Sequence, residues 1–262
     1  MSELTLFLAL AALAGAAFAL RSAGRAAHLL EFTLAEQVPE LHGQVASRDS
    51  DTFRQLEALV GLYVELQPRR PLPPTRGWAA SPDFLALLAR HALQSRPRVI
   101  VECGSGVSTV VLARACERNQ CGHVWSLEHL PEMASFTREW LAEHGVGAYA
   151  TVVDAPLLPH TIDGLDGRWY SAAGLPNQPI DMLVVDGPPA ATGRLARYPA
   201  GPCLFPRLAP QGAVFVDDAH RGDERAMIAR WEVEFPAMSR TSAPCEKGAV
   251  VLKRDTESKV RS

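Results

Sequence analysis

The chain has 262 residues, of which 47% are hydrophobic and 21% charged, so it is long enough for one large domain with an appended segment. A formal net charge of −3, without long runs of Lys or Arg, argues against nucleic acid as a partner. Five scattered cysteines without a CxxC pair exclude a disulfide scaffold and indicate a reducing compartment such as the cytosol.

The chain begins with an uncharged apolar segment at residues 4–20, which predicts a membrane-anchor helix within residues 1–24. Such a helix spans about 25 Å, slightly less than a hydrocarbon core of about 30 Å. Arg21 and Arg25 follow the segment, so the positive-inside rule places the remainder in the cytoplasm. A cleaved signal peptide and a buried helix are the alternatives.

Residues 25–76 are expected to form a helical extension and a linker. Apolar residues at helical spacing predict helices between residues 28 and 66, divided at Pro39 and at the polar stretch 47–51. These helices could pack on the main domain or pair with a second copy of the chain in a homodimer. The proline-rich residues 68–74 are stiff and extended, and lead into a main domain at residues 77–262.

The main domain alternates short apolar strands with helices, which predicts an α/β fold with a doubly wound, mainly parallel sheet. Ser81 and Pro82 mark the start of its first helix, as N-cap and first helical residue. Residues 155–179 are expected to form a long irregular loop. The strands are expected at residues 98–101, 123–127, 148–153, 180–185, 213–216 and 249–253, and the helices at 81–95, 108–117, 131–144, 201–208 and 223–235.

Acidic residues follow the first five strands, and ligands of such sheets bind beyond the carboxyl ends of the strands. The acids are Glu102, Glu128, Asp154, Asp186 and the pair Asp217–Asp218. Unpaired carboxylates crowded at one sheet edge cost stability, so the pattern indicates a functional site.

The first strand runs into a glycine turn, Gly104 to Gly106, that opens a helix. Glycine lets a ligand approach the backbone, and the free amides of the helix suit a carboxylate group. A dinucleotide fingerprint would need a third glycine where Thr109 stands, which disfavours an oxidoreductase.

The motifs ECGSG, SLEH, VVD, VVDGPP and VFVDDAHR resemble those of the class I S-adenosylmethionine-dependent methyltransferases, in particular a bacterial branch often attached to membrane segments. The resemblance covers residues 78–253 and implies a Rossmann-like sheet and S-adenosylmethionine as cofactor. It implies that the glycine turn holds the methionine part, Glu128 the ribose hydroxyls and Asp154 the adenine amine. The expected cofactor residues are Glu102, Gly104, Ser105, Gly106, Glu128, Asp154 and Asp186.

The acids at the fourth and fifth strand ends, Asp186, Asp217 and Asp218, suit a divalent cation such as Mg²⁺, which takes oxygen ligands. They are similar to the acids of metal-dependent catechol-type and macrolide-sugar O-methyltransferases. The resemblance implies a metal that binds a diol-like acceptor, with Asp186 and Asp217 as catalytic residues. His220 would then remove the proton. The rigid turn at residues 187–189 departs from the catechol enzymes. In the alternative reading, Asp217 caps a turn or pairs with Arg221, and His220 is a surface residue.

Several other side chains have two readings each. Trp169 and Tyr170 could wall the acceptor pocket or anchor their loop to the core. Trp78 could cover the cofactor. Three residues after the fourth strand could recognise an anionic acceptor or form surface ion pairs: Arg194, Arg197 and Tyr198. Three histidines are expected to face solvent: His123, His129 and His144.

These observations predict a membrane-anchored, cytosol-facing methyltransferase that methylates oxygen of a small-molecule or glycan-type acceptor, with Mg²⁺ as a second cofactor. A membrane-associated scaffold with a vestigial cofactor site and a dinucleotide-binding oxidoreductase are the alternatives.

Overall fold

The computed structural model describes residues 50–162 and 164–254. The chain divides into two compact units, residues 1–53 and 54–262, and the second contains the α/β domain. The predicted membrane anchor at residues 4–20 lies outside the described residues. Among the helices of residues 50–162 and 164–254, none combines the length and the apolar character needed to cross a membrane.

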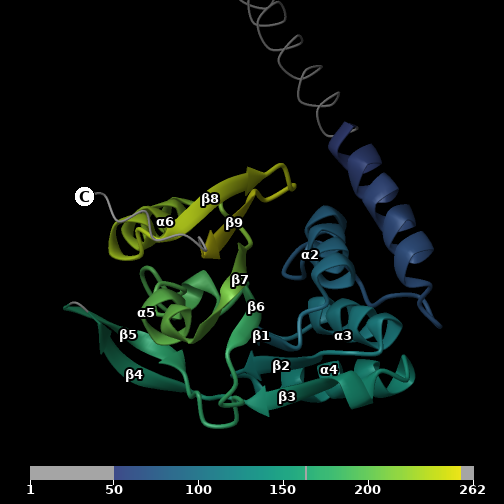
Figure 1. Cartoon of the computed structure of the whole chain (residues 1–262), viewed down its shortest axis with the longest axis horizontal. Helices are drawn as coiled ribbons and strands as arrows, with labels where there is room; N and C mark the ends of the chain where they lie inside the picture. Colours follow the sequence, from purple (N-terminus) through teal and green to yellow (C-terminus); the bar gives the residue numbers. More distant parts are fainter. Residues whose placement is uncertain (1–49, 163, 255–262) are drawn as a thin grey trace, which may run out of the picture. The chain divides into compact units, whose positions relative to one another are not determined.

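A seven-stranded sheet forms the centre of the domain, with strand order β3-β2-β1-β6-β7-β9-β8 (Figure 1). The first five strands are parallel, and β9 runs antiparallel to both of its neighbours. This confirms the predicted doubly wound, mainly parallel sheet. The strands are β1 (Val99–Cys103), β2 (His123–Glu128), β3 (Ala150–Asp154), β6 (Ile180–Val185), β7 (Leu208–Val216), β8 (Met238–Ala243) and β9 (Ala249–Arg254).

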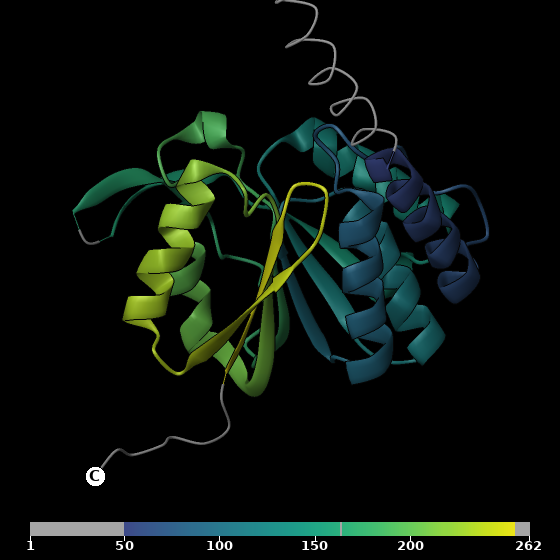
Figure 2. The same ribbon diagram turned by 90° about the horizontal axis from the view of Figure 1, so that it is seen from above.

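Helices cover both faces of the sheet (Figure 2). Successive side chains of a strand point to opposite faces, so Ile100 of β1 packs in the core with α2 and α3, whereas Val101 packs in the core with α5 and α6. All five residues of β1 are buried, as expected of a strand inside a parallel sheet. The helices are α2 (Pro82–Ser95), α3 (Val107–Asn119), α4 (Pro131–Glu143), α5 (Ala200–Leu204) and α6 (Gly222–Glu234).

The start of α2 lies where the sequence predicts it, with Ser81 at the N-cap and Pro82 in the first turn. The Ser81 hydroxyl, however, donates to the Asp83 carboxylate at 2.6 Å and makes no capping bond to the helix. Asp83 instead accepts from the Phe84 amide at 2.9 Å, so a carboxylate in the first turn satisfies a free amide of this helix.

The predicted irregular loop at residues 155–179 is wrong, because it contains the hairpin β4 (Leu157–Ile162) and β5 (Leu165–Tyr170). The edge strand β8 is a strand that the sequence pattern missed. The predicted helix at residues 201–208 is shorter, since α5 passes into a 3-10 turn, Phe205–Arg207. Strand β7 accordingly begins at Leu208, five residues before its predicted start.

Candidate active site

The strand order places β1 beside β6, where the order in which the chain adds strands to the sheet reverses. An open α/β sheet binds its ligands at this point of reversal. The backbones after the two strands lie close together: the Asp186 amide donates to the Cys103 carbonyl at 3.2 Å. A Cβ on Gly187 would lie 2.3 Å from the Tyr170 hydroxyl and 3.2 Å from the Gly104 Cα. Gly187 is therefore required by close packing, and it forms a cis peptide bond with Pro188.

Glu102, the last acidic residue before the glycine turn, is completely buried. Its Oε2 accepts hydrogen bonds from the hydroxyls of Thr109 at 2.6 Å and Ser126 at 2.8 Å. Among the described residues, its Oε1 has no hydrogen-bond partner. Burial raises the pKa of Glu102 to about 7. Glu102 therefore keeps one free acceptor oxygen beside the glycine turn.

Thr109 stands where a dinucleotide fingerprint has glycine, and it has a structural role that the sequence reading missed. Its hydroxyl donates to Glu102 and accepts from the Gly106 amide at 3.0 Å, which closes the turn onto the start of α3. A Cβ on Gly106 would have no heavy atom within 4 Å, so this side of the turn is open to a ligand.

Glu128, at the end of β2, is held by four neutral donors. Its Oε2 accepts from the amide and hydroxyl of Ser105, each at 3.0 Å. Its Oε1 accepts from the amides of His129 at 2.8 Å and Leu130 at 2.9 Å. The structure thus joins the glycine turn and the β2–α4 connection through one buried carboxylate.

Asp154 lies apart from this network. It is the Cα partner of Glu128 in the β2–β3 register, but its side chain is 71% exposed and pairs with Arg138 at 2.7 Å. An open cavity of about 510 Å³ lies nearby, lined by His129, Pro156 and Leu157 among others. The predicted contact of Asp154 with adenine stays a prediction.

Three carboxylates converge at the ends of β6 and β7. Asp186, Asp217 and Asp218 each offer an oxygen within 4.8 Å of the others. Asp217 is completely buried, and neither of its oxygens has a hydrogen-bond partner among the described residues. Burial, followed by the charges of Asp186 and Asp218, raises the pKa of Asp217 to about 8. Asp218 has a φ of +60°, and such strained backbone concentrates at functional sites.

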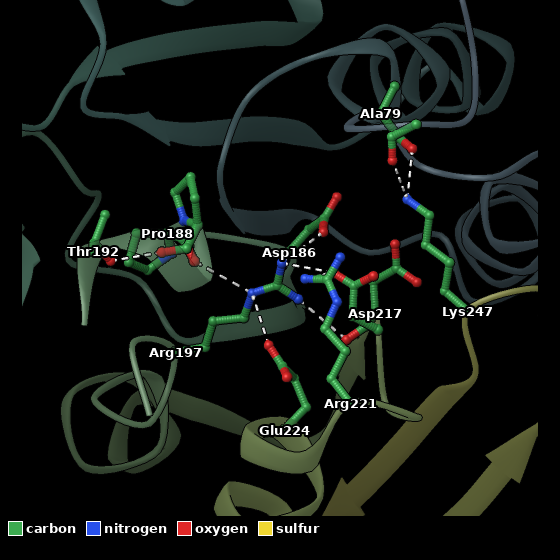
Figure 3. A network of polar contacts seen from close by, with 12 residues as sticks. Ala79, Asp186, Pro188, Thr192, Arg197, Asp217, Arg221, Glu224 and Lys247 are labelled. Atoms are coloured by element: carbon green, nitrogen blue, oxygen red, sulfur yellow. Dashed lines mark hydrogen bonds and ion pairs between the residues drawn. The ribbon is translucent and has the colours of Figure 1, made fainter. Parts of the chain in front are cut away.

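A buried guanidinium balances part of this negative charge (Figure 3). Arg197 is 4% exposed, and its Nη2 lies 2.8 Å from Asp218 Oδ2 and 3.4 Å from Asp186 Oδ1. Its Nε lies 3.7 Å from the buried Glu224. Of the two alternatives for Arg197, the surface contact is therefore wrong, and the role of Glu224 was missed. Arg221 pairs with Asp218 at 2.8 Å, whereas the alternative reading had paired it with Asp217.

His220 is exposed, and its ring packs against Gly248, whose added Cβ would lie 2.4 Å from the ring Cδ2. Within the described ranges, no hydrogen bond or ion pair joins the imidazole to the three carboxylates. Its role as a base therefore stays a prediction that requires the side chain to turn.

A cavity of about 350 Å³ opens beside the acidic cluster. Asp186, Asp218, Arg221 and Lys247 line it, together with Trp78, which is 90% exposed. Trp78 therefore lies on the acceptor side of the site, beside the carboxylates.

The other aromatic and basic residues have varied positions. Trp169 and Tyr170 are buried in the core, which favours the anchoring role for both. Tyr198 is also buried, and its hydroxyl donates to Glu234 at 2.8 Å. Arg194 is exposed.

Solvent exposure was predicted wrongly for three histidines. His144 is buried at the end of α4, and burial lowers its pKa. His123 is half-buried and contacts the Thr151 hydroxyl at 2.8 Å. His129 is half-buried beside Glu128. The histidines are buried or half-buried because neighbouring helices and strands pack against them. Residue spacing within one element does not reveal such packing.

Comparison with known proteins finds one family model that matches part of the chain. Residues 101–219 match a family model described as a methyltransferase domain. No curated protein matches the sequence. The matched segment runs from β1 past the end of β7, so it includes Glu102, Glu128, Asp186, Asp217 and Asp218.

Solved structures with the same fold are distant in sequence. The SAH-bound methyltransferase PaMTH1 of Podospora anserina has a TM-score of 0.57 at 16% identity, over 81% of this chain and 96% of that chain. A candidate caffeoyl-CoA O-methyltransferase from Staphylococcus aureus has a TM-score of 0.52 at 14% identity, over 81% and 99%. A candidate O-methyltransferase from Klebsiella pneumoniae has a TM-score of 0.51 at 18% identity, over 79% of this chain and 96% of that chain.

At these identities the structural likeness shows the fold alone, and the family match covers the segment that contains the strand ends. Residues 101–219 are therefore similar to a methyltransferase domain, and the described part of the chain has the fold of these solved methyltransferases.

Proposed function

We propose that the domain transfers the methyl group of S-adenosylmethionine to a hydroxyl oxygen of a small-molecule or glycan-type acceptor, with a divalent cation held by Asp186, Asp217 and Asp218. The observation that carries the proposal is the Asp217 carboxylate, which is buried without a donor beside two further carboxylates and a cavity. Such a group is costly unless a ligand engages it. Three carboxylate oxygens are a donor set that suits Mg²⁺.

The cofactor side has residues that fit S-adenosylmethionine. The free Oε1 of Glu102 can accept a hydrogen bond from the cofactor's ammonium group, and the open side of Gly106 leaves room for it. Glu128 is held in place by four donors, so a ribose hydroxyl would bind it by replacing or sharing one of these contacts. The SAH-bound state of the Podospora methyltransferase supports a ligand of this class in the same fold.

Methyl transfer is an in-line displacement at the sulfonium carbon, so the protein contributes mainly position and charge. A bound cation supplies Lewis acidity that lowers the pKa of the acceptor hydroxyl. In this proposal Asp186, which lines the cavity, would orient that hydroxyl, and the buried Asp217 would act from beneath it. His220 would reach the acceptor only after its ring leaves Gly248. The neighbours described as O-methyltransferases also support oxygen as the acceptor atom.

The cation can be tested by titrating the full chain with Mn²⁺ in the presence of S-adenosylhomocysteine, followed by electron paramagnetic resonance. We expect one bound ion, lost in Asp217→Asn and kept in the matched control Asp154→Asn. Equal Mn²⁺ binding by both variants would remove the cation from the proposal.

The acceptor atom can be tested with catechol and 1,2-diaminobenzene, which differ only in the nucleophile. Mass spectrometry should detect a methylated product from catechol alone. Methylation of the diamine alone would overturn oxygen as the acceptor.

We also propose that residues 4–20 hold the domain at the cytoplasmic side of a membrane and that the chain forms a homodimer. The apolar segment and the following Arg21 and Arg25 support the anchor. Cell fractionation of the full chain and of a chain lacking residues 1–24 tests it, since only the full chain should sediment with membranes. Light scattering of the shorter chain tests the dimer.

A further inference from the structure

The 350 Å³ cavity beside the acidic cluster has a basic side as well. Arg197, Arg221 and Lys247 line it together with Asp186 and Asp218. The Asp218 Oδ2 accepts from both Arg197 and Arg221, each at 2.8 Å, so one carboxylate oxygen serves two guanidinium groups. Asp218 is thus shared between two guanidinium groups, and Lys247 is the third cation of the cavity lining.

Lys247 provides the clearest free charge. Its ammonium donates to the carbonyls of Gly77 and Ala79, each at 2.9 Å, and both acceptors are neutral (Figure 3). Within residues 54–162 and 164–254, no carboxylate forms an ion pair with it. An ammonium has three donors, so one remains for a ligand in the cavity.

Trp78 lies between the two carbonyls that bind Lys247. The Arg76–Glu246 ion pair, at 2.6 Å, ties the same turn to the β8–β9 connection. That connection also reaches the residues after Asp218, because the His220 amide donates to the Lys247 carbonyl at 3.1 Å. These contacts hold the turn that carries Trp78 at the cavity, and its exposed indole offers an aromatic surface on which a flat ring can stack.

We propose that the acceptor is a flat-ring hydroxyl compound that carries an anionic group, with Lys247 and Arg221 binding the anion and Trp78 stacking on the ring. This inference rests on the proposed function, because the acceptor hydroxyl must lie at Asp186, which lines the same cavity. A carboxylate on the ring makes charge-assisted hydrogen bonds to an ammonium and a guanidinium, and these are stronger than bonds between neutral groups. Lys247 and Arg221 thereby act as specificity-determining residues.

The test compares 3,4-dihydroxybenzoate with its methyl ester, which keeps the ring and both hydroxyls but lacks the charge. Each is titrated by calorimetry into the full chain, with saturating S-adenosylhomocysteine and Mg²⁺. We expect the acid to bind about tenfold more tightly than the ester. Lys247→Met should remove this preference, whereas Lys247→Arg should retain it.

Two further variants separate charge from structure. Glu246→Gln removes a charge from the same connection without changing the cavity lining, so it should keep the preference for the acid. Trp78→Ala should weaken acid and ester by the same factor, and Trp78→Phe should restore both. Thermal unfolding of each variant checks that it is folded.

Three outcomes would overturn the inference while S-adenosylhomocysteine still binds: equal affinity for acid and ester, a preference that survives Lys247→Met in folded protein, or failure of both probes to bind. If the folded wild-type chain did not bind S-adenosylhomocysteine, that result would instead overturn the proposed function.

Discussion

The two halves of the sheet edge hold their carboxylates by different means. On the cofactor side, hydroxyl and amide groups such as those of Ser105 and Thr109 hold Glu102 and Glu128. On the acceptor side, Arg197 and Arg221 face the carboxylates, and Asp217 has no donor among the described residues. Neutral donors leave the negative charge available to a cationic cofactor, whereas the acceptor side combines both signs of charge for a ligand that brings its own.

The largest expected effect is loss of the buried guanidinium. Arg197→Met leaves Asp218, Asp186 and Glu224 without their shared partner, so the free energy of unfolding should fall by about 3–5 kcal/mol in urea titrations. The exposed Arg194→Met is the matched control and should change it by less than about 0.5 kcal/mol. Adding Asp218→Asn to Arg197→Met should recover part of the loss. Equal stability of the two single variants would contradict the buried charge balance.

Ionisation of Glu102 should make stability depend on pH. Its pKa rises from 4.5 to about 7 on folding, because burial disfavours the charged form. The folded state therefore binds the proton more tightly, and stability that is present below pH 4.5 is lost as the pH rises through about 7. The loss amounts to about 3 kcal/mol at most. Urea midpoints should fall more steeply between pH 5 and 8 for the wild type than for Glu102→Gln, and parallel curves would contradict the shift.

Asp217→Asn should separate turnover from cofactor binding. We expect the rate of methyl transfer to fall about 100-fold or more, equivalent to about 2.7 kcal/mol. Calorimetry should find the affinity for S-adenosylhomocysteine unchanged, because Asp217 lies on the acceptor side. A fully active variant would exclude Asp217 from the reaction.

The smallest effect contrasts two acids of the cofactor side. Glu128→Ala should weaken S-adenosylhomocysteine binding about 10–30-fold, since a fixed, buried carboxylate is lost. Asp154→Ala should weaken it less than about threefold, because that side chain is exposed and already paired with Arg138. Calorimetric titration of both variants checks the order, and a larger effect at Asp154 would reverse it.

The buried part of the fold could be predicted from the sequence because its strands are apolar runs with helices between them. The β4–β5 hairpin and β8 could not, since their exposed side chains follow no apolar pattern: β8 reads MSRTSA with four exposed residues. Hydrophobic periodicity reports burial, and these strands bury little.

Only the site residues at the carboxyl ends of strands could be predicted from the sequence. Asp186, Asp217 and Asp218 follow strands that pair in parallel, so their convergence was expected. The burial of Arg197 was not, because it depends on Asp218 and Glu224, which lie more than 20 residues away. Thr109 appeared only as a departure from a glycine motif, and its hydroxyl bonds became clear from the fold.

The most direct test of the account is calorimetric titration of the full chain with S-adenosylhomocysteine and, separately, with NAD. We predict one S-adenosylhomocysteine bound per chain, weakened by Glu128→Ala, and no binding of NAD. Binding of NAD alone would favour a dinucleotide oxidoreductase, and binding of neither by folded protein would favour a scaffold with a vestigial site. Either result would contradict a methyltransferase.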